Sequence, residues 1–439
     1  MMRRIIGVSA FGVVALLGEA AHASPEDIFG YGGRSSALGG TGIAHARGYE
    51  AVYANPALLG GLTTRKLTLG VTGATFSLFA REAGTTSRVT APGAHGIVVG
   101  ADVPIPFGGA LKDRVGFGLA FYTPSDVIVR GRILYPETPQ YPFFADRAQS
   151  VAVRVGLGAD LGSGIRVGAG FAALAEIVGS VNIATDATGK VGAKVEDQLV
   201  ATYAPTFGAS YTRQVSKKDE LVVGAVVRGK LDARFAVAVD ATRLSSLNLP
   251  VFNIAGLAQY DPFQAGFEAA LVRTERTLAI SVTWKHWSAY PGLLEPTVRC
   301  EDGTDCGILQ PPVPDMSDTV VVRVGAEQRV FKTNAVALRA RGGAFFEPSP
   351  LGSKAAASDA YSRGTQAIGP VPSRTLDASR VALTWGAGVT FAKLPFDIDV
   401  FGQLHVLVPR SIDISTTSPN EVRASGHAFS FGTTIGVKL

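Results

Sequence analysis

Apolar residues alternate with small, polar or charged residues along most of this chain. In residues 115–121 every odd position is apolar, and Gly or Ala fills the positions between. The same period recurs in residues 151–157, 165–171, 221–227, 320–324 and 429–439. Because successive side chains of a strand point to opposite faces, this period predicts strands with one apolar face. The other face is mostly small or charged, and Arg recurs on it.

The connections between the predicted strands alternate between short and long. Fourteen strands are predicted to begin near Lys66, Ala94, Val115, Arg147, Gly164, Val200, Asp219, Gln264, Thr277, Thr319, Asn334, Ala378, Phe396 and Gly426. Short connections are 104–112, 160–164, 215–219, 273–276, 331–334 and 393–395, and long ones are 81–94, 124–146, 178–198, 231–263, 289–318, 348–376 and 408–425. Short turns on one side and long loops on the other are typical of outer-membrane barrels.

The pattern therefore predicts an all-β fold, a transmembrane antiparallel β-barrel of about 14 strands. A soluble β-sandwich shows the same alternation. Arg on the inner face of strand after strand fits a hydrated lumen better than a dry core. No internal repeat of fixed period indicates a propeller or a solenoid.

Composition agrees with a barrel. Hydrophobic residues make up 46% of the chain and the mean hydropathy is +0.23, yet no apolar run after Leu17 reaches the roughly 20 residues of a spanning helix. In a barrel, lumen residues interrupt the apolar ones and dilute the hydropathy. The net charge of +5 is small for 439 residues, so we expect no nucleic-acid partner.

The chain begins with the features of a secretory signal. Arg3 and Arg4 precede an apolar run, residues 5–17, which is followed by Ala21-His22-Ala23. This order predicts a signal peptide over residues 1–23 and export of the mature chain. A retained N-terminal anchor is the alternative, but the run is short for a spanning helix.

The next segment follows neither a helical nor a strand period. Residues 32–59 are rich in Gly and Ala and end in Asn55-Pro56-Ala57 and two leucines. An irregular compact segment between an export signal and the first strand suggests a plug. We therefore divide the mature chain into an N-terminal hatch, residues 24–64, and a barrel, residues 65–439, and predict that 32–59 packs inside the lumen.

Basic residues in the lumen register are candidate ligand-binding residues. A carboxylate in a low-dielectric passage needs a cationic partner. The alternative is that each basic residue pairs with a lumen acid, such as Glu268 or Glu327, or with the plug. The candidates are Arg154, Arg166, Arg228, Arg323 and Arg339.

Two aromatic stretches lie on the long-loop side. The excursion 133–144 carries Tyr135, Phe143 and Phe144, which either capture an apolar ligand or fold over the mouth and bury themselves. In residues 283–290, Trp and Tyr are predicted to form an aromatic girdle at the outer interface, with ligand contact as the alternative.

Catalytic and cofactor chemistry has little support in the sequence. The only cysteines, Cys300 and Cys306, are predicted to form a disulfide across a short loop, and no His lies beside them to suggest a metal. Residues 168–173 come near a dinucleotide fingerprint but sit within a strand pattern. We expect no catalytic residue, metal or cofactor.

Several stretches resemble one known family in the same order. Residues 32–59 resemble the hatch of the FadL/TodX outer-membrane transporters of long-chain fatty acids and aromatic hydrocarbons. The stretches 114–126, 258–290, 317–327, 338–350 and 376–391 resemble later blocks, including the Trp287-Ser288 pair. The chain ends in Leu439, where the family usually has an aromatic residue.

The resemblance implies a fourteen-stranded barrel with an N-terminal hatch in its lumen, and we expect a monomer in outer-membrane lipid. It also implies capture of a hydrophobic ligand by loops, transfer to a pocket near the hatch, and lateral release through a gap at a kinked strand. We expect passive uptake of hydrophobic molecules, most of all long-chain fatty acids. A barrel scaffold for a surface or secretion assembly is the alternative. A lipid hydrolase using His286 and Ser288 is a third hypothesis, without a supporting acid in the sequence pattern.

Overall fold

The computed structural model describes residues 28–91, 93–125, 138–145, 151–185, 191–243, 251–292, 297–299, 313–358, 361–363, 366–368, 371–415 and 419–439. The predicted signal peptide, Tyr135, Cys300 and Cys306 lie outside these residues. In the described residues no helix is both long and apolar enough to cross a membrane.

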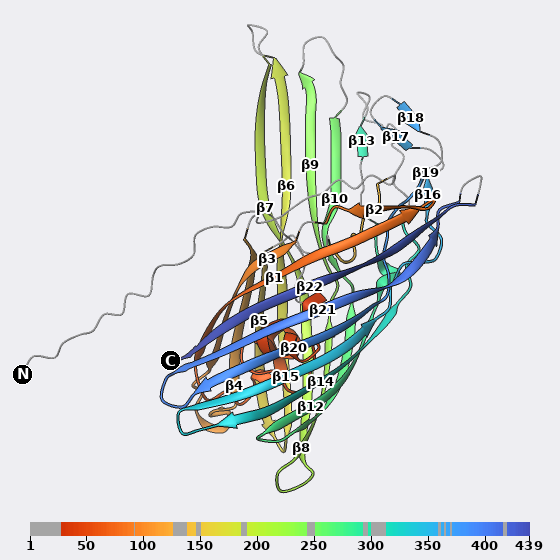
Figure 1. The fold of residues 1–439 in the computed structure, drawn as a ribbon. Coiled ribbons are helices and arrows are strands. Elements are labelled where there is room, and N and C mark those ends of the chain that lie inside the picture. Colours follow the sequence, from red (N-terminus) through yellow and green to blue (C-terminus); the bar gives the residue numbers. More distant parts are fainter. Residues whose placement is uncertain are drawn as a thin grey trace, which may run out of the picture.

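Fourteen described strands form a closed antiparallel barrel (Figure 1). Each strand pairs with the next, and the last returns to the first, where Lys66 to Glu82 pair with Lys438 to Val422. The strands are β1 (Lys66–Glu82), β3 (Ala94–Pro104), β4 (Val115–Pro124), β5 (Ala152–Gly162), β6 (Ile165–Thr185), β7 (Val191–Gln214), β8 (Glu220–Arg228), β11 (Gln264–Val272), β12 (Arg276–Lys285), β14 (Thr319–Lys332), β15 (Val336–Glu347), β20 (Arg380–Phe391), β21 (Phe396–Asp413) and β22 (Glu421–Lys438). The predicted fold and strand count are confirmed.

One group of strands extends beyond the barrel. A strand needs roughly 9–11 residues to cross a bilayer, whereas β6 has 21 and β7 has 24. β9 (Leu231–Arg243) pairs in parallel with the far part of β6 and antiparallel with β10 (Val251–Asp261). Figure 1 shows these strands rising past the rim. Parts of the expected long loops 178–198 and 231–263 are therefore strands.

The remaining elements are short. β2 (Thr85–Val89) pairs with β1, and β13 (Thr297–Arg299) pairs with β10. Two small hairpin pairs lie in the long connection before β20. They are β16 (Ala357–Ser358) with β19 (Val371–Pro372), and β17 (Tyr361–Arg363) with β18 (Gln366–Ile368). Two single-turn helices, η2 (Gly109–Leu111) and η3 (Trp287–Ala289), complete the connections.

The alternation in sequence separates the outer wall from the lumen. On β12, Leu278 and Ile280 are about half exposed on the outside, whereas Thr277, Ser281 and Thr283 are buried on the inside. The predicted tight turns join the strands at one end, called the turn end below. The other end, called the loop end, carries the long connections and the extensions formed by β6, β7, β9 and β10 (Figure 1).

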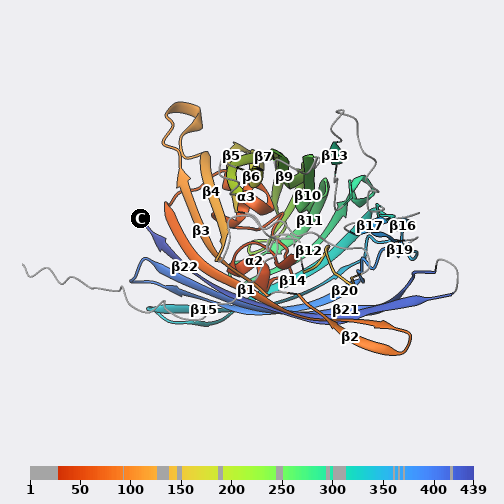
Figure 2. The ribbon, with the colours of Figure 1, turned by 90° about the horizontal axis from the view of Figure 1, so that it is seen from above.

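The N-terminal segment, residues 28–62, lies inside the ring of strands (Figure 2). It contains α2 (Gly33–Ala37), α3 (Glu50–Ala54) and η1 (Pro56–Leu59). Helix α2 contacts β20 and β21, whereas η1 contacts β5, β6 and β7 on another part of the wall. Nearly all residues of these three short helices are buried.

Glycines on the inner wall let the segment approach closely. A Cβ added at Gly168 would collide with the backbone of Pro56 and Ala57, and one at Gly158 would collide with Pro56 and Gly60. Only a residue without a side chain fits where two backbones touch. This explains the small residues in 168–173 as packing positions rather than a nucleotide site.

Candidate ligand site in the barrel lumen

A small cavity lies between the N-terminal segment and the barrel wall. Its volume is about 30 Å³, which suffices for about two water molecules. Apolar and aromatic groups share the lining with hydroxyl, amide and guanidinium groups. The residues that matter most are Ile28, Tyr31, Tyr53, Arg228, Gln264, Ser281, Thr283, Arg323 and Phe345.

Arg323 enters this cavity from β14. Because the strand alternates, Val321, Arg323 and Glu327 all face the lumen, and Val321 and Glu327 are buried there. An Nη1 hydrogen of Arg323 is donated to Thr283 Oγ1 at 3.4 Å, and the guanidinium lies 5.5 Å from the centre of the Phe345 ring. The described contacts of Arg323 are thus a hydroxyl and an aromatic face, which leave its positive charge in place.

Arg228 lines this cavity from β8, and Arg154 on β5 lies beside it, against the Tyr53 ring. Arg228 donates to the carbonyl oxygens of Tyr53 and Ala54 at 3.0 Å each, and to Gln264 Oε1 at 3.2 Å. The guanidinium groups of Arg228 and Arg154 lie 4.5 and 4.8 Å from the centre of the Tyr53 ring. Both residues line a neighbouring cavity of about 20 Å³. They join the wall to α3.

Arg166 and Arg339 lie away from the cavity. Arg166 Nε is 3.1 Å from Asp160 Oδ2, near the turn between β5 and β6. Arg339 Nη1 is 3.5 Å from Glu327 Oε1, and its Nη2 donates to the Thr274 carbonyl at 3.2 Å. The structure therefore gathers three of the five candidate arginines and pairs the other two with acids. For Arg339, the structure shows the pairing with a lumen acid that the sequence analysis gave as the alternative to ligand binding.

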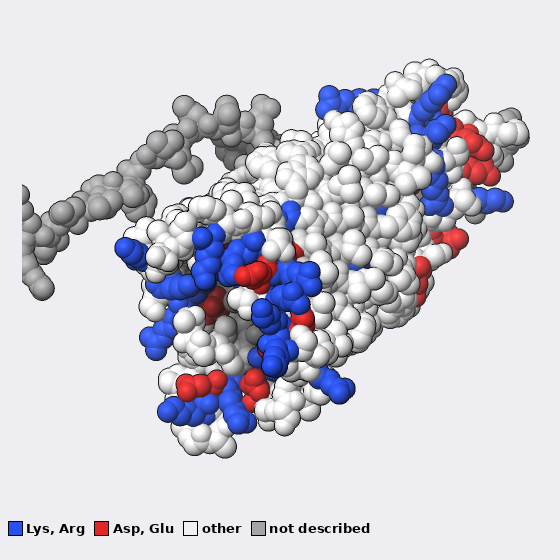
Figure 3. Space-filling model, turned by 60° about the horizontal axis from the view of Figure 1, so that its bottom comes forward, with Lys and Arg blue, Asp and Glu red and all other residues white. Residues whose placement is uncertain are grey.

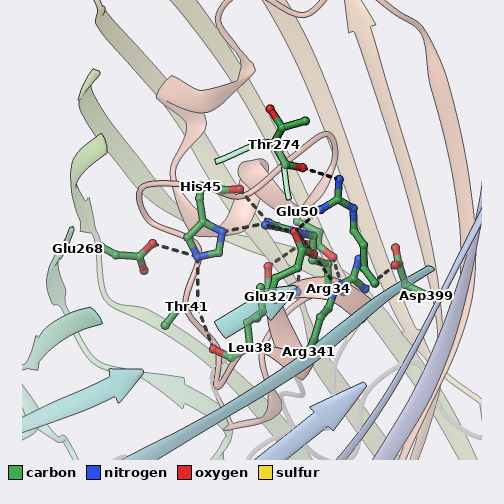
Figure 4. A network of polar contacts seen from close by, with 12 residues as sticks. Arg34, Leu38, Thr41, His45, Glu50, Glu268, Thr274, Glu327, Arg341 and Asp399 are labelled. Carbon is green, nitrogen blue, oxygen red and sulfur yellow. Dashed lines mark hydrogen bonds and ion pairs between the residues drawn. The ribbon is translucent and has the colours of Figure 1, made fainter. Parts of the chain in front are cut away.

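A second group of charges joins the N-terminal segment to β14, β15 and β21 (Figure 4). Glu327 accepts hydrogen bonds from Arg34 Nε at 3.0 Å and from Arg341 Nε at 2.7 Å. Arg341 Nη1 also lies 2.5 Å from Asp399 Oδ1. Glu327 and Arg34 are almost fully buried. We call Arg34, Glu327, Arg339, Arg341 and Asp399 the arginine–carboxylate network.

Glu268 and His45 extend this contact to β11. The Glu268 carboxylate accepts three backbone N–H bonds, from Gly42, Ile43 and Ala44, at 2.8 to 3.1 Å. His45 Nδ1 lies 3.0 Å from Arg34 Nη1, and Nε2 lies 3.4 Å from Glu268 Oε1 (Figure 4). Because Arg only donates, Nδ1 is the acceptor and Nε2 carries the proton. Burial and the Arg34 charge hold the pKa of His45 well below its ordinary value.

The Asn55-Pro56-Ala57 sequence fixes the end of the segment. Asn55 Oδ1 accepts the backbone N–H of Ala57 at 3.0 Å, which caps η1. Asn55 Nδ2 donates to Ile43 at 2.7 Å within the segment and to Ala209 at 3.0 Å on β7. Asn55 is fully buried. One amide side chain thus satisfies the backbone of the segment and of the wall.

Aromatic side chains fill the lumen toward the loop end. Phe143 packs edge-on against Trp287 and Tyr290, at ring-centre distances of 5.8 and 5.1 Å. Phe144 packs against Phe76 and is almost fully buried. The described part of the 133–144 loop therefore folds over the mouth and buries its aromatic rings. The prediction of an aromatic girdle at the outer interface was wrong for Trp287 and Tyr290, because both rings are buried in this aromatic cluster.

His286 and Ser288 lie beside an acid that the sequence pattern did not reveal. Asp318 Oδ2 is 3.1 Å from His286 Nδ1, and Ser288 Oγ is 3.2 Å from the same nitrogen. A hydrolase triad needs the acid and the serine on different ring nitrogens, so that the ring can pass a proton between them. This arrangement does not meet that requirement.

The comparisons with known proteins agree on the architecture. No family model matches this chain, and no curated protein matches its sequence. Among solved structures, a FadL homologue from Pseudomonas aeruginosa is similar with a TM-score of 0.58 and 16% identity, covering 95% of this chain and 99% of that one. The toluene transporter TodX from P. putida is similar with a TM-score of 0.55 and 14% identity, covering 94% and 99%. The chain therefore has the fold seen in these FadL and TodX channels.

Proposed function

We propose that this protein is an outer-membrane channel for passive uptake of hydrophobic molecules, and that its preferred ligands are long-chain fatty acids. The observation that carries the proposal is Arg323, whose charge faces a cavity lined by Phe345, Ile28 and Tyr31. A guanidinium among apolar side chains suits a ligand with one carboxylate and an apolar body. The names of the similar structures, a FadL homologue and toluene transporters, support the hydrophobic class.

Uptake requires movement of the N-terminal segment. Cavities that hold small-molecule ligands measure about 300–1,000 Å³, whereas the cavity at Arg323 holds only about 30 Å³. The aromatic cluster at Phe143 and Phe144 covers the other side. We infer that residues 28–62 act as a hatch and that this structure represents the closed state.

Release into the surrounding membrane completes the proposal. An acyl chain that enters water loses about 0.8 kcal/mol for each CH₂ group that leaves an apolar environment. A lateral exit through the wall avoids that cost, and a monomer suffices for it. No chemical step on the ligand is needed, so we propose a channel and not an enzyme.

The head-group role of Arg323 can be tested by separating charged from neutral ligands. Purified Arg323→Gln protein should bind a long-chain fatty acid about tenfold more weakly, since a hydrogen-bonded charge is lost, and should bind toluene as before. The matched control is Arg166→Gln, which removes the same charge at the Asp160 pair. An equal loss of affinity for the fatty acid and for toluene would mean that Arg323 has only a structural role.

Transport itself is tested in cells. A strain that depends on this gene should lose accumulation of labelled fatty acid when the gene is deleted, and regain it with the wild-type gene. Normal uptake in the deletion strain, together with purified protein that retains no hydrophobic ligand, would overturn the channel proposal. Stoichiometric co-purification of surface or secretion proteins would then support the scaffold alternative.

A further inference from the structure

The outer wall carries an apolar groove that the lumen site does not explain. Its volume is about 590 Å³, within the range of small-molecule sites. It crosses β8, β11, β12, β14 and β15, and every lining residue is Gly, Ala, Val, Leu or Ile. The lining comprises Leu221, Ala269, Leu271, Leu278, Ala279, Ile280, Val324, Gly325, Ala326, Gly342, Gly343 and Ala344.

Small residues in one row create the hollow. Leu278 on β12 pairs with Ala326 on β14, which pairs with Gly342 on β15. Leu278 and Ile280 project from the wall beside Ala326 and Gly342, which rise little above the backbone. The groove is therefore a feature of side-chain size along a continuous sheet, and not a break in hydrogen bonding.

The N-terminal segment supports the groove from inside. A Cβ at Gly325 or Gly343 would collide with the backbone of Leu38, and at Gly343 also with Gly39. The wall is thus backed by α2 and its following turn at the place where its outer face is hollow. The backbone at Leu38 and Gly39 therefore packs directly against the inner face of this part of the wall.

Basic residues lie at the end of the groove nearest the turns. Arg276 precedes Leu278 by two residues on β12 and so shares its outward register. Its buried Nε has no hydrogen-bond partner in the part of the chain that the structure describes. Asp219 is paired with Arg273 at 2.6 Å and also lies within electrostatic range of Arg276. Figure 3 shows Lys and Arg gathered over this end of the barrel, with Asp and Glu among them.

We propose that this groove binds an anionic phospholipid of the leaflet at the turn end, with an acyl chain along the groove and the phosphate at Arg276. The inference rests on the proposed membrane location, but not on transport. A guanidinium beside an apolar channel complements both parts of such a lipid, because Arg binds phosphate oxygens with several donors at once. A bound lipid would bridge β11, β12, β14 and β15 over the position where α2 rests inside.

Native mass spectrometry of the full mature protein can test this site. The protein is equilibrated with equal amounts of phosphatidylglycerol and phosphatidylethanolamine in detergent, and retained lipid is counted. We expect wild-type protein to retain phosphatidylglycerol about tenfold better. Arg276→Gln should abolish this preference, and Ala326→Leu, which fills the groove, should lower retention of both lipids.

Matched substitutions elsewhere on the barrel serve as controls. Ala169→Leu makes the same change on the exposed outer face of β6, and Arg65→Gln removes a charge from another turn-end position. Both should leave lipid retention unchanged. A shift in electrophoretic migration between heated and unheated samples should show that every variant is folded. Equal retention of the two lipids by wild type, or equal loss in the controls, would overturn the site. Fatty-acid uptake plays no part in this measurement, so failure of the transport proposal would not affect it.

Discussion

Arg323 and Arg341 face the same lumen from neighbouring strands, but they meet different partners. Arg341 contacts two carboxylates, Glu327 at 2.7 Å and Asp399 at 2.5 Å. Arg323, which precedes Glu327 by four residues on β14, contacts the Thr283 hydroxyl at 3.4 Å and the Phe345 ring. One guanidinium is neutralised by acids, whereas the described contacts of the other contain no acid.

The difference separates two tasks within one lumen. A buried ion pair with full hydrogen bonding fixes geometry, because loss of either partner leaves an uncompensated charge. The arginine–carboxylate network therefore locates the N-terminal segment. A guanidinium held by a hydroxyl and a ring retains attraction for an incoming carboxylate. Arg323 therefore suits ligand contact.

Removing the shared acid should have the largest effect. Glu327→Gln takes the carboxylate from Arg34, Arg339 and Arg341 while keeping the side-chain shape. Breaking a buried pair in this way costs about 3–5 kcal/mol. We expect a lower urea midpoint for unfolding and a rise in ion conductance across planar bilayers, because the segment loses its attachment.

An exposed pair provides the control for that experiment. Arg329 Nη2 lies 2.6 Å from Glu275 Oε1, and Glu275 is about 60% exposed. Glu275→Gln should change stability by less than about 1 kcal/mol, as surface pairs usually do. If Glu327→Gln behaved like Glu275→Gln, the network would have no role in holding the segment.

Introducing an acid beside Arg323 should make its surroundings resemble those of Arg341. Thr283→Glu would offer a carboxylate to the same guanidinium and occupy the place of a ligand head group. Fatty-acid affinity should fall about tenfold, a loss of roughly 1.4 kcal/mol, and toluene binding should fall less. Thr283→Gln is the neutral control of equal size. The same loss in both variants would mean that bulk, and not charge, causes it.

The barrel could be predicted because its determinants are local in sequence. Alternation in 115–121 or 429–439 needs only a period of two, and the turns 160–164 and 273–276 end strands by themselves. The placement of residues 32–59 within the lumen could also be predicted, since a Gly-rich irregular segment has few other places to pack. The full length of β6 and β7 could not be predicted from a bilayer-spanning length, because their pairing continues well past the roughly 9–11 residues that cross a bilayer.

The candidate site was harder to predict from the sequence, because its pairings join residues that are far apart in the chain. Arg34 and Glu327 are 293 positions apart, and nothing in either sequence neighbourhood identifies the partner. The lumen register placed Arg323 and Arg339 alike, but only packing shows that one meets Phe345 and the other Glu327. Arg34 and His45 were not singled out, although isolated ionisable residues within a Gly/Ala-rich segment could have indicated buried contacts.

Lowering the pH should weaken the attachment of the N-terminal segment through His45, which is the smallest of these effects. His45 is buried between Arg34 and Glu268, with Glu327 near it on β14 and Arg47 near it in the same N-terminal segment. Burial and Arg34 lower the pKa of His45, so His45 is neutral while the segment is docked. In a released segment the exposed His45 would gain a proton near pH 6.5. The contribution of neutral His45 to the free energy of docking is therefore fully present above pH 6.5. It is lost as the pH falls below that value, by at most about 1.4 kcal/mol for each pH unit.

Hydrogen exchange in residues 28–62 at pH 7.5 and pH 5.5 gives the measurement. Wild type should exchange faster at pH 5.5 after correction for the intrinsic rate, and His45→Gln should show a smaller difference. Burial raises the pKa of Glu50 and acts in the opposite direction, but it does so in both proteins, so the difference between them isolates His45. His286→Gln, at an exposed loop histidine, is the control. Equal pH dependence in wild type and His45→Gln would remove His45 from the attachment and leave Glu327 as the centre of the contrast with Arg323.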